Sequence, residues 1–411
     1  MRMRAPGCGL VAVALIGAGF GCARPSAATA EAGAHWVGTW EAAPQVTEER
    51  NLPPAPGLAG STLRQIVHVS LGGGQLRVRL SNEFGNGPVT IAGARVAASG
   101  MGGSGAIVTA SDRALTFRGQ TGVSISAGAA ALSDPLAFDV KPLSDLAITI
   151  AVAGAPTDVT GHPGSRTTSY LQSGDGLSAA SMPNATKVEH WYFLGGIDVV
   201  HPRGAALVVL GNSIADGRGS ATDRQNRWPD NLARRLQRES ATTDVAVLNA
   251  GIGGNCVLRV CIGPSGRERL ERDVLSQTGV RWLILSEGVN DLGGARTADA
   301  AQAVAGQLID AYVGIITGAH QRGLRVYGAT ILPFGKSFYD SPDREVARQR
   351  VNTWIRTSGA FDAVVDFDAA MRDNQQPTRL RSEVDGGDHL HPNELGYRVM
   401  ADVIDLALFA R

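Results

Sequence analysis

Aromatic side chains, cysteine and net charge are all scarce in this 411-residue sequence. Aromatic residues make up 5% of it, cysteine occurs four times, and 38 basic residues balance 38 acidic ones. A chain without net charge or a basic run lacks the cationic surface that nucleic acids require, so we expect no nucleic-acid partner. Beyond the first thirty residues no apolar run approaches the roughly eighteen residues of a membrane-spanning helix, so no transmembrane segment is predicted in the mature chain.

The N-terminal residues 1–30 are typical of an export signal. Two arginines precede an apolar run over residues 9–21, and small residues follow as far as Ala30. The run is too short for a permanent membrane helix. We therefore predict a secreted, extracellular protein with a bacterial signal peptide. Cys22 raises lipid anchoring as a less favoured alternative, because Gly19 stands where a lipobox normally has leucine.

The two cysteines in the body of the chain, Cys256 and Cys261, are five positions apart. In an exported protein such a pair favours one disulfide, with two free buried thiols as the alternative. The loop is too short for much chain-entropy stabilisation, so the bond would mainly fix the position of the chain after Gly254. No histidine or further cysteine lies at zinc spacing, so no metal is predicted, and no cofactor is expected.

Residues 31–203 have the pattern of an all-β domain. Short β-type runs lie at 63–71, 75–80, 89–96, 114–117 and 146–152. Many short strands separated by Gly and Pro predict a jelly-roll-like β-sandwich. Gly72–Gly74 is interpreted as a hairpin connection between the first two runs. Residues 157–187 are polar and rich in Gly and Ser, which predicts a long loop at the rim of an active site.

Residues 204–411 change to a strand, loop and helix pattern. The predicted strands are 205–210, 245–249, 282–285, 325–329 and 363–366, and the predicted helices are 228–236, 298–320, 344–355 and 394–408. Five strands alternating with helices predict an α/β domain, a doubly wound parallel sheet of flavodoxin-like order. We place the boundary between the two domains near residues 200–204.

Four polar clusters stand where this α/β pattern ends its strands or opens its last helix. They are Gly211–Ser213, Asn249–Asn255, Ser286–Asp291 and Asp388–Pro392. The carboxyl ends of parallel strands share one edge of a sheet, so the clusters can gather there. A serine, a glycine-rich turn, an asparagine and an Asp/His pair together supply what acyl transfer needs. Ser213 is the candidate nucleophile, although a serine after a strand can also simply cap the next helix.

The four clusters resemble the sequence blocks of the SGNH or GDSL hydrolases, in order and at plausible spacing. The usual Gly-Asp-Ser appears as Gly211-Asn212-Ser213, Gly-x-Asn-Asp as Gly288–Asp291, and Asp-x-x-His-Pro as Asp388–Pro392. The resemblance covers roughly residues 204–411, which it makes the catalytic domain. The residues upstream resemble the N-terminal domain of secreted, xylan-esterase-like members. A lipase-type elbow is excluded, because Ala215 stands where G-x-S-x-G needs its second glycine.

The resemblance implies the roles of the site residues. The triad would be Ser213, His391 and Asp388, and the oxyanion hole would use the backbone N–H groups of Ser213 and Gly254 and the side-chain amide of Asn290. Asp388 is expected to raise the pKa of His391 above its ordinary value of about 6.5.

Three nearby residues have competing interpretations. His389 with Asp385 is the alternative His/Asp pair. Glu287 could titrate near the site, or it could have a solvated or hydrogen-bonded role at the surface. Asp291 is expected to be a structural acceptor rather than a base.

The predicted activity is hydrolysis of a carboxylic ester, with removal of acetyl groups from polysaccharide as the leading substrate class. A lipase or phospholipase remains an alternative, because members of the family that the chain resembles accept very different acyl and alcohol parts. A carbohydrate-binding surface protein without turnover and a glycosidase with paired carboxylates are the alternatives from other classes.

Overall fold

The computed structural model describes residues 1–3, 33–100 and 105–410. It divides the chain into two compact units, Met1–Ala34 and His35–Arg411. Nearly all of the predicted signal peptide, including Cys22, lies outside the described residues. Among the described residues, no helix combines the length and apolar character needed to cross a membrane.

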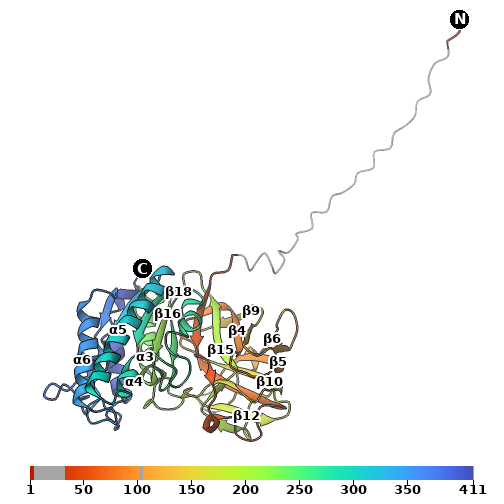
Figure 1. Ribbon diagram of the computed structural model, residues 1–411. Helices are drawn as coiled ribbons and strands as arrows, with labels where there is room; N and C mark the ends of the chain where they lie inside the picture. The colour runs from red at the N-terminus through yellow and green to blue at the C-terminus, as the bar shows by residue number, and fades with distance from the viewer. Residues whose placement is uncertain (4–32, 101–104, 411) are drawn as a thin grey trace. The chain divides into compact units, whose positions relative to one another are not determined.

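The N-terminal part of the larger unit consists of antiparallel sheets. One sheet has the order β1 (Trp36–Glu41), β15 (Leu194–Val200), β4 (Gly73–Asn82), β8 (Ala129–Leu132), with β9 (Leu136–Val140) also on β4. A second has the order β13 (Thr186–Val188), β12 (Ser169–Ser173), β3 (Ser61–His68), β10 (Asp145–Gly154), β5 (Val89–Ala98), β6 (Arg113–Leu115), with β7 (Val123–Ile125) on β5. A small sheet joins β14 (Trp191–Tyr192), β11 (Thr160–His162) and β2 (Gln45–Val46). The predicted sandwich is confirmed (Figure 1).

Strand β4 illustrates why this sequence forms a sandwich. Its alternate residues Leu76, Val78 and Leu80 are fully buried, whereas Arg77 and Arg79 between them are partly exposed. Successive side chains of a strand point to opposite faces, so this alternation gives the sheet one apolar face to bury.

Two details of this part differ from the sequence prediction. The glycines at 72–74 do not form a hairpin, because β3 and β4 belong to different sheets. They carry the chain between the sheets, and a Cβ on Gly73 would lie 2.6 Å from the Val200 carbonyl oxygen. Residues 157–187 are not one loop either, since they contain β11, β12 and the start of β13. Strand β12 pairs with β3, which buries Tyr170 and Leu171.

The C-terminal part is built on a parallel sheet. Its order is β17 (Val245–Gly251), β16 (Ala205–Gly211), β18 (Val280–Ser286), β19 (Arg325–Ala329), β20 (Ala363–Val365). The first of these strands in the chain, β16, therefore lies second in the sheet, which is the flavodoxin-like order 2-1-3-4-5. The predicted fold of this part is confirmed.

Helices cover both faces of this sheet (Figure 1). The long ones are α3 (Trp228–Arg238), α5 (Ala298–Gln321), α6 (Pro342–Thr357) and α8 (Glu394–Asp402); the short ones are α2 (Ser213–Asp216), α4 (Val289–Gly293) and α7 (Phe367–Met371). Alternate residues of β16 face opposite helix layers. Val208 belongs to the buried hydrophobic cluster that contains residues of α5 and α6, and Val209 belongs to the one that contains residues of α3 and α8. The last predicted helix ends early, and a 3-10 turn at Leu406–Phe409 follows.

The β-sandwich and the parallel sheet share one hydrophobic core. Residues of both contribute to the same buried cluster, including Val37 of β1 and Leu248 of β17. The Gly38 N–H donates to the Thr278 carbonyl oxygen at 2.9 Å, and Ala42 forms a parallel bridge with Asn249. The sandwich therefore lies directly beside the strand ends that carry the polar clusters.

Candidate active site

Strand β16 ends in a tight turn that presents Ser213. The Asn212 side chain accepts a hydrogen bond from the Ile214 N–H at 3.0 Å, so Asn212 caps α2 and leaves the Ser213 hydroxyl available. The turn needs glycine at 211, because a Cβ there would lie 2.5 Å from the Ala215 Cβ. Ser213 is therefore not the helix cap that the alternative interpretation made it.

The Ser213 hydroxyl lies beside His391, although 178 positions separate the two residues. Ser213 Oγ is 2.9 Å from His391 Nε2, and His391 Nδ1 is 2.7 Å from Asp388 Oδ2. The other carboxylate oxygen, Asp388 Oδ1, accepts from the backbone N–H groups of Leu390 at 3.1 Å and His391 at 2.9 Å. Hydroxyl, imidazole and carboxylate thus form one continuous hydrogen-bonded chain.

The alternative His/Asp pair is also present but points elsewhere. His389 Nδ1 is hydrogen-bonded to Asp385, and the His389 side chain is 43% exposed. The His391 side chain is 7% exposed and is the one in contact with Ser213. Geometry therefore favours the Asp388 and His391 pair.

Burial lowers the pKa of His391 from its ordinary value. Asp388 acts in the opposite direction, while the positive charges of Arg218 and Arg166 add to the lowering. The predicted upward shift of this pKa was wrong, because burial and the two arginines outweigh the carboxylate. A lowered pKa keeps the imidazole neutral at pH 7, which is the form that can accept a proton from a hydroxyl.

Gly254 and Asn290 line the same cavity as Ser213 and His391. The Asn290 side chain is fixed at both ends: its oxygen accepts from the Tyr339 hydroxyl at 3.0 Å and its amide donates to the Asn255 carbonyl oxygen at 2.7 Å. Because a primary amide has two N–H groups, one remains for a ligand. Gly254 has φ +73°, a left-handed conformation that favours glycine.

The loop after Gly254 contains the predicted disulfide. Cys256 and Cys261 are bonded, with a Cα–Cα distance of 5.7 Å. Both carboxylate oxygens of Asp291 also accept from this loop, from the backbone N–H groups of Val257 at 2.9 Å and Leu258 at 3.0 Å. The expectation that Asp291 is a structural acceptor is confirmed, and the loop is held by both covalent and hydrogen bonds.

Arg269 is a structural residue of the site that the sequence did not indicate. Its guanidinium is fully buried and donates to the carbonyl oxygens of Ala250 at 2.6 Å and Gly211 at 2.9 Å. It also reaches Asn255 Oδ1 at 3.0 Å and Glu287 Oε1 at 3.3 Å. One side chain thereby connects the ends of three strands. A single arginine in a polar stretch gives no indication of such a role in the sequence.

One interpretation of the sequence placed Glu287 at the surface, but the residue is buried. It is 2% exposed, and burial raises its pKa to about 8, against the opposing charge of Arg269. Its Oε2 accepts from the Asn212 side-chain amide at 3.2 Å, so it supports the turn that presents the serine.

Both parts of the chain contribute to the wall of the cavity. The cavity has a volume of about 400 Å³, and the side chains from the β-sandwich part include Gln45, Glu48, Arg50, His162, Arg166 and His190. His162 connects the two parts: its Nε2 is 2.9 Å from Asp216 Oδ1, and its Nδ1 is 2.9 Å from the Ala43 carbonyl oxygen. The expectation that residues 157–187 reach the rim is met by His162 and Arg166.

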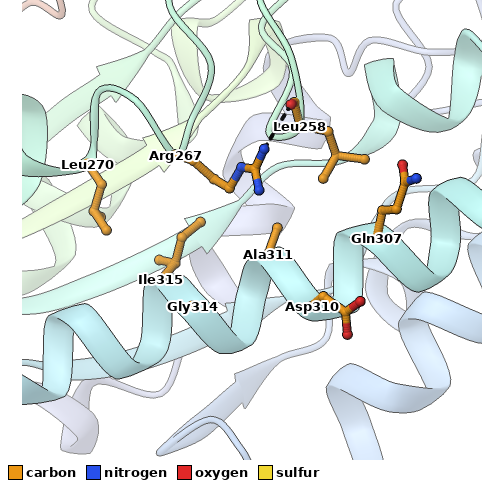
Figure 2. Close-up of a pocket in the computed structure, with 8 residues that line it drawn as sticks. All are labelled: Leu258, Arg267, Leu270, Gln307, Asp310, Ala311, Gly314 and Ile315. Carbon is orange, nitrogen blue, oxygen red and sulfur yellow. Dashed lines mark hydrogen bonds between the residues drawn. The ribbon is translucent and has the colours of Figure 1, made fainter.

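A larger hollow of about 600 Å³ lies between α5 and the loop that follows the disulfide (Figure 2). Arg267 and Asp310 line it, and the Arg267 guanidinium donates to the Leu258 carbonyl oxygen at 3.1 Å. Its lining within the described part of the chain includes no serine, cysteine or histidine. Nor do the described residues contain any group of three or more His, Cys, Asp or Glu placed to hold a metal ion.

Comparison with known families agrees with this geometry. Residues 209–399 match the GDSL-like lipase/acylhydrolase family. This stretch is a GDSL hydrolase domain. The protein is accordingly a carboxylic ester hydrolase, and the matched residues contain Gly211, Ser213, Asn290 and the Asp388–His391 pair.

Solved structures similar to the GDSL domain cover about half of this chain. A GDSL-like lipase from Bacteroides thetaiotaomicron VPI-5482 is 17% identical, with 50% of this chain and 88% of that chain covered and a TM-score of 0.36. A catalytic mutant of an acetylxylan esterase from Geobacillus stearothermophilus is 20% identical, with 49% and 93% covered and a TM-score of 0.37. None of the curated proteins compared with the chain matches it.

Proposed function

We propose that this GDSL hydrolase cleaves esters through a catalytic triad of Ser213, His391 and Asp388. The observation that carries the proposal is the unbroken chain of contacts, 2.9 Å from Ser213 Oγ to His391 Nε2 and 2.7 Å from His391 Nδ1 to Asp388. A serine hydroxyl is a weak nucleophile until a neighbouring base removes its proton, and here the base and its orienting carboxylate are both in position.

The reaction proceeds in two steps. Ser213 Oγ attacks the ester carbonyl carbon while His391 takes the hydroxyl proton, and Asp388 stabilises the resulting imidazolium. The intermediate breaks its bond to the alcohol oxygen, which receives the proton from His391, and an acyl group stays on Ser213. Water then attacks this acyl group with His391 again as base, which releases the carboxylic acid and restores the serine.

The charge that develops on the carbonyl oxygen needs hydrogen-bond donors. We assign this role to the backbone N–H groups of Ser213 and Gly254 and to the free side-chain N–H of Asn290. The fixed orientation of the Asn290 amide supports the assignment, because a donor held in place costs no reorganisation when the charge appears.

We propose acylated carbohydrate, with an acetyl group as the acyl part, as the substrate class. The charged and polar lining of the cavity supports a polar alcohol part. A lipase or phospholipase would be expected to surround its site with an apolar approach surface. Among the described residues Phe338 is the one large apolar side chain exposed at this cavity, which favours the polar substrate.

Export to the extracellular space and the division at residues 203 and 204 are also part of the proposal. The charged start and apolar run of residues 1–30 support export. The proposed boundary lies in the connection between β15 and β16. Sequencing the N-terminus of protein recovered from the culture medium tests export, and an N-terminus still at residue 1 on protein retained inside the cell contradicts it.

The experiment that tests the proposed catalysis is hydrolysis of p-nitrophenyl acetate by the wild type, Ser213→Ala and the control Ser240→Ala. Loss of the nucleophile should lower turnover by about 10⁶-fold by analogy with other triads. The exposed Ser240 lies outside the cavity, so its variant should match the wild type. Equal rates for Ser213→Ala and wild type would remove the triad. Activity of Ser213→Ala on a glycoside would favour the glycosidase alternative, and a wild type inert on every ester would favour a binding protein.

A further inference from the structure

Three arginines line the cavity beside the candidate triad: Arg50, Arg166 and Arg218. Two carboxylates line it as well, and both are already engaged. Glu48 accepts from the side chains of Gln45 at 3.3 Å and Asn51 at 2.7 Å. Asp216 is hydrogen-bonded to His162 at 2.9 Å. The three guanidiniums therefore outnumber the two carboxylates in the lining of the cavity.

None of these three guanidiniums has an ion pair within residues 33–100 and 105–410. The Nε of Arg166 is buried and also lacks a hydrogen-bond partner in the described structure. Buried donors are normally satisfied, as the guanidinium of Arg269 is. Arg166 lines the cavity, so its guanidinium, which has no ion pair, is placed to bind an anion that enters there.

The backbone holds Arg166 in an unusual conformation. Its φ is +50°, in the left-handed region that side chains other than Asn and Asp seldom adopt. The Asp223 N–H donates to the Arg166 carbonyl oxygen at 2.9 Å, and the Asp223 carboxylate accepts from the N–H and hydroxyl of Thr168, both at 2.7 Å. Strained residues fixed in this way concentrate at ligand-binding sites.

Arg218 is anchored in a similar way from the catalytic side. Its carbonyl oxygen accepts from the buried Tyr397 hydroxyl at 2.5 Å. Its side chain is exposed, lines the cavity and has no ion pair within the described part of the chain. Both guanidiniums act electrostatically on His391, whose pKa they help to lower. They therefore lie within electrostatic reach of the bond that Ser213 would attack.

We propose that Arg166 and Arg218 bind an anionic group of the substrate next to the ester cleaved by Ser213. The substrate class is an ester of an acidic molecule whose carboxylate or phosphate accepts from the guanidiniums. Arginine suits this role because its planar donors match both oxyanions in pairs. The inference rests on the proposed ester-hydrolase function and adds to it that the natural ester is charged, as an acylated acidic sugar is.

Matched ester pairs test this inference, with kcat and KM measured at pH 8, where the imidazole is neutral. Acetylated glucuronic acid against its methyl ester places the carboxylate on the alcohol side. The p-nitrophenyl monoester of glutaric acid against p-nitrophenyl valerate places it on the acyl side, and acetylated glucose 6-phosphate against acetylated glucose supplies a phosphate. In at least one pair we expect kcat/KM to favour the anionic member about tenfold or more, mainly through KM, and the preference to shrink at 0.5 M salt.

Arg166→Gln and Arg218→Gln should each bring that ratio close to one. Arg398→Gln, an exposed arginine of α8 outside the cavity, is the matched control and should keep the ratio. A wild type that hydrolyses esters without preference in any pair, or Arg166→Gln and Arg218→Gln variants that both keep the full preference, overturns the anion site and leaves the proposed function intact.

A second measurement separates the anion site from catalysis. Glucuronate and inorganic phosphate should raise the melting temperature of the wild type and of Arg398→Gln, but not that of Arg166→Gln. A wild type that turns over no ester contradicts the proposed function, whereas protection by either anion still supports the site. For a wild type that turns over no ester, absence of protection by both anions overturns the site.

Discussion

Replacing Asp388 with asparagine exchanges one carboxylate oxygen for an NH₂ group and tests the hydrogen-bonded chain of the triad. Because Asp388 Oδ1 accepts two backbone N–H groups, at 3.1 and 2.9 Å, the asparagine oxygen should stay there. The new NH₂ group then faces His391 Nδ1, which must accept, so the ring proton moves to Nε2. An Nε2 that carries a proton cannot take one from Ser213.

The expected loss in kcat is about 10⁴-fold, which corresponds to about 5 kcal/mol in the activation free energy. The melting temperature should change little, because the two backbone hydrogen bonds remain. Both quantities are measured with p-nitrophenyl acetate and by thermal unfolding.

Asp385→Asn is a matched control within the same loop. Asp385 Oδ1 accepts the backbone N–H groups of Gly387 at 2.8 Å and His389 at 3.0 Å, and its other oxygen contacts the His389 ring, as Asp388 does for His391. Only the contact with Ser213 is missing, so this variant should keep wild-type activity. An Asp388→Asn enzyme with more than about a tenth of wild-type kcat would refute the assigned role of the carboxylate.

Three further outcomes are expected. Because burial lowers the pKa of His391 and only the neutral ring accepts a proton, kcat/KM should rise with pH through a midpoint below 6.5 and then stay level; a midpoint above 6.5 contradicts this. Changing both Cys256 and Cys261 to serine should lower the free energy of unfolding by about 2 kcal/mol in urea titrations, and an unchanged value would show that the short loop gains nothing from the bond. Tyr339→Phe removes the hydroxyl that orients Asn290 and should lower kcat about fivefold with KM nearly constant. A fivefold rise in KM with an unchanged kcat would instead place Tyr339 in substrate binding.

The α/β part of the fold was predictable because its signals are local. Apolar runs such as residues 205–210 are buried on both faces, and glycine and polar residues end each of them. The polar clusters that contain Ser213, Gly254 and Asn290 could be placed together because parallel strands share one edge at their carboxyl ends. The resemblance to the family placed His391 beside them. The disulfide between Cys256 and Cys261 was also predictable, since the spacing of the two cysteines fits such a bond.

The parts that sequence reasoning missed depend on contacts between distant segments. Gly72–Gly74 has the composition of a hairpin turn, and only the pairing of β4 with β15 rather than with β3 shows that the glycines connect two sheets. Nothing in the residues around Arg269 indicates that its side chain reaches the ends of three strands. The pKa of His391 was misjudged because the sequence shows the neighbouring Asp388 but not the burial or the arginines that approach from elsewhere.

The shared cavity has a consequence for how such an enzyme can change its substrate. The proposed nucleophile Ser213 follows β16 and the proposed base His391 precedes α8, whereas Arg166 and His162 come from the β-sandwich. Loops of the sandwich can therefore be exchanged or mutated to alter which ester is accepted while the bond-breaking groups stay untouched. A chain that began at residue 204 would keep Ser213 and His391 but lose one side of the cavity, so the two parts have to be engineered together.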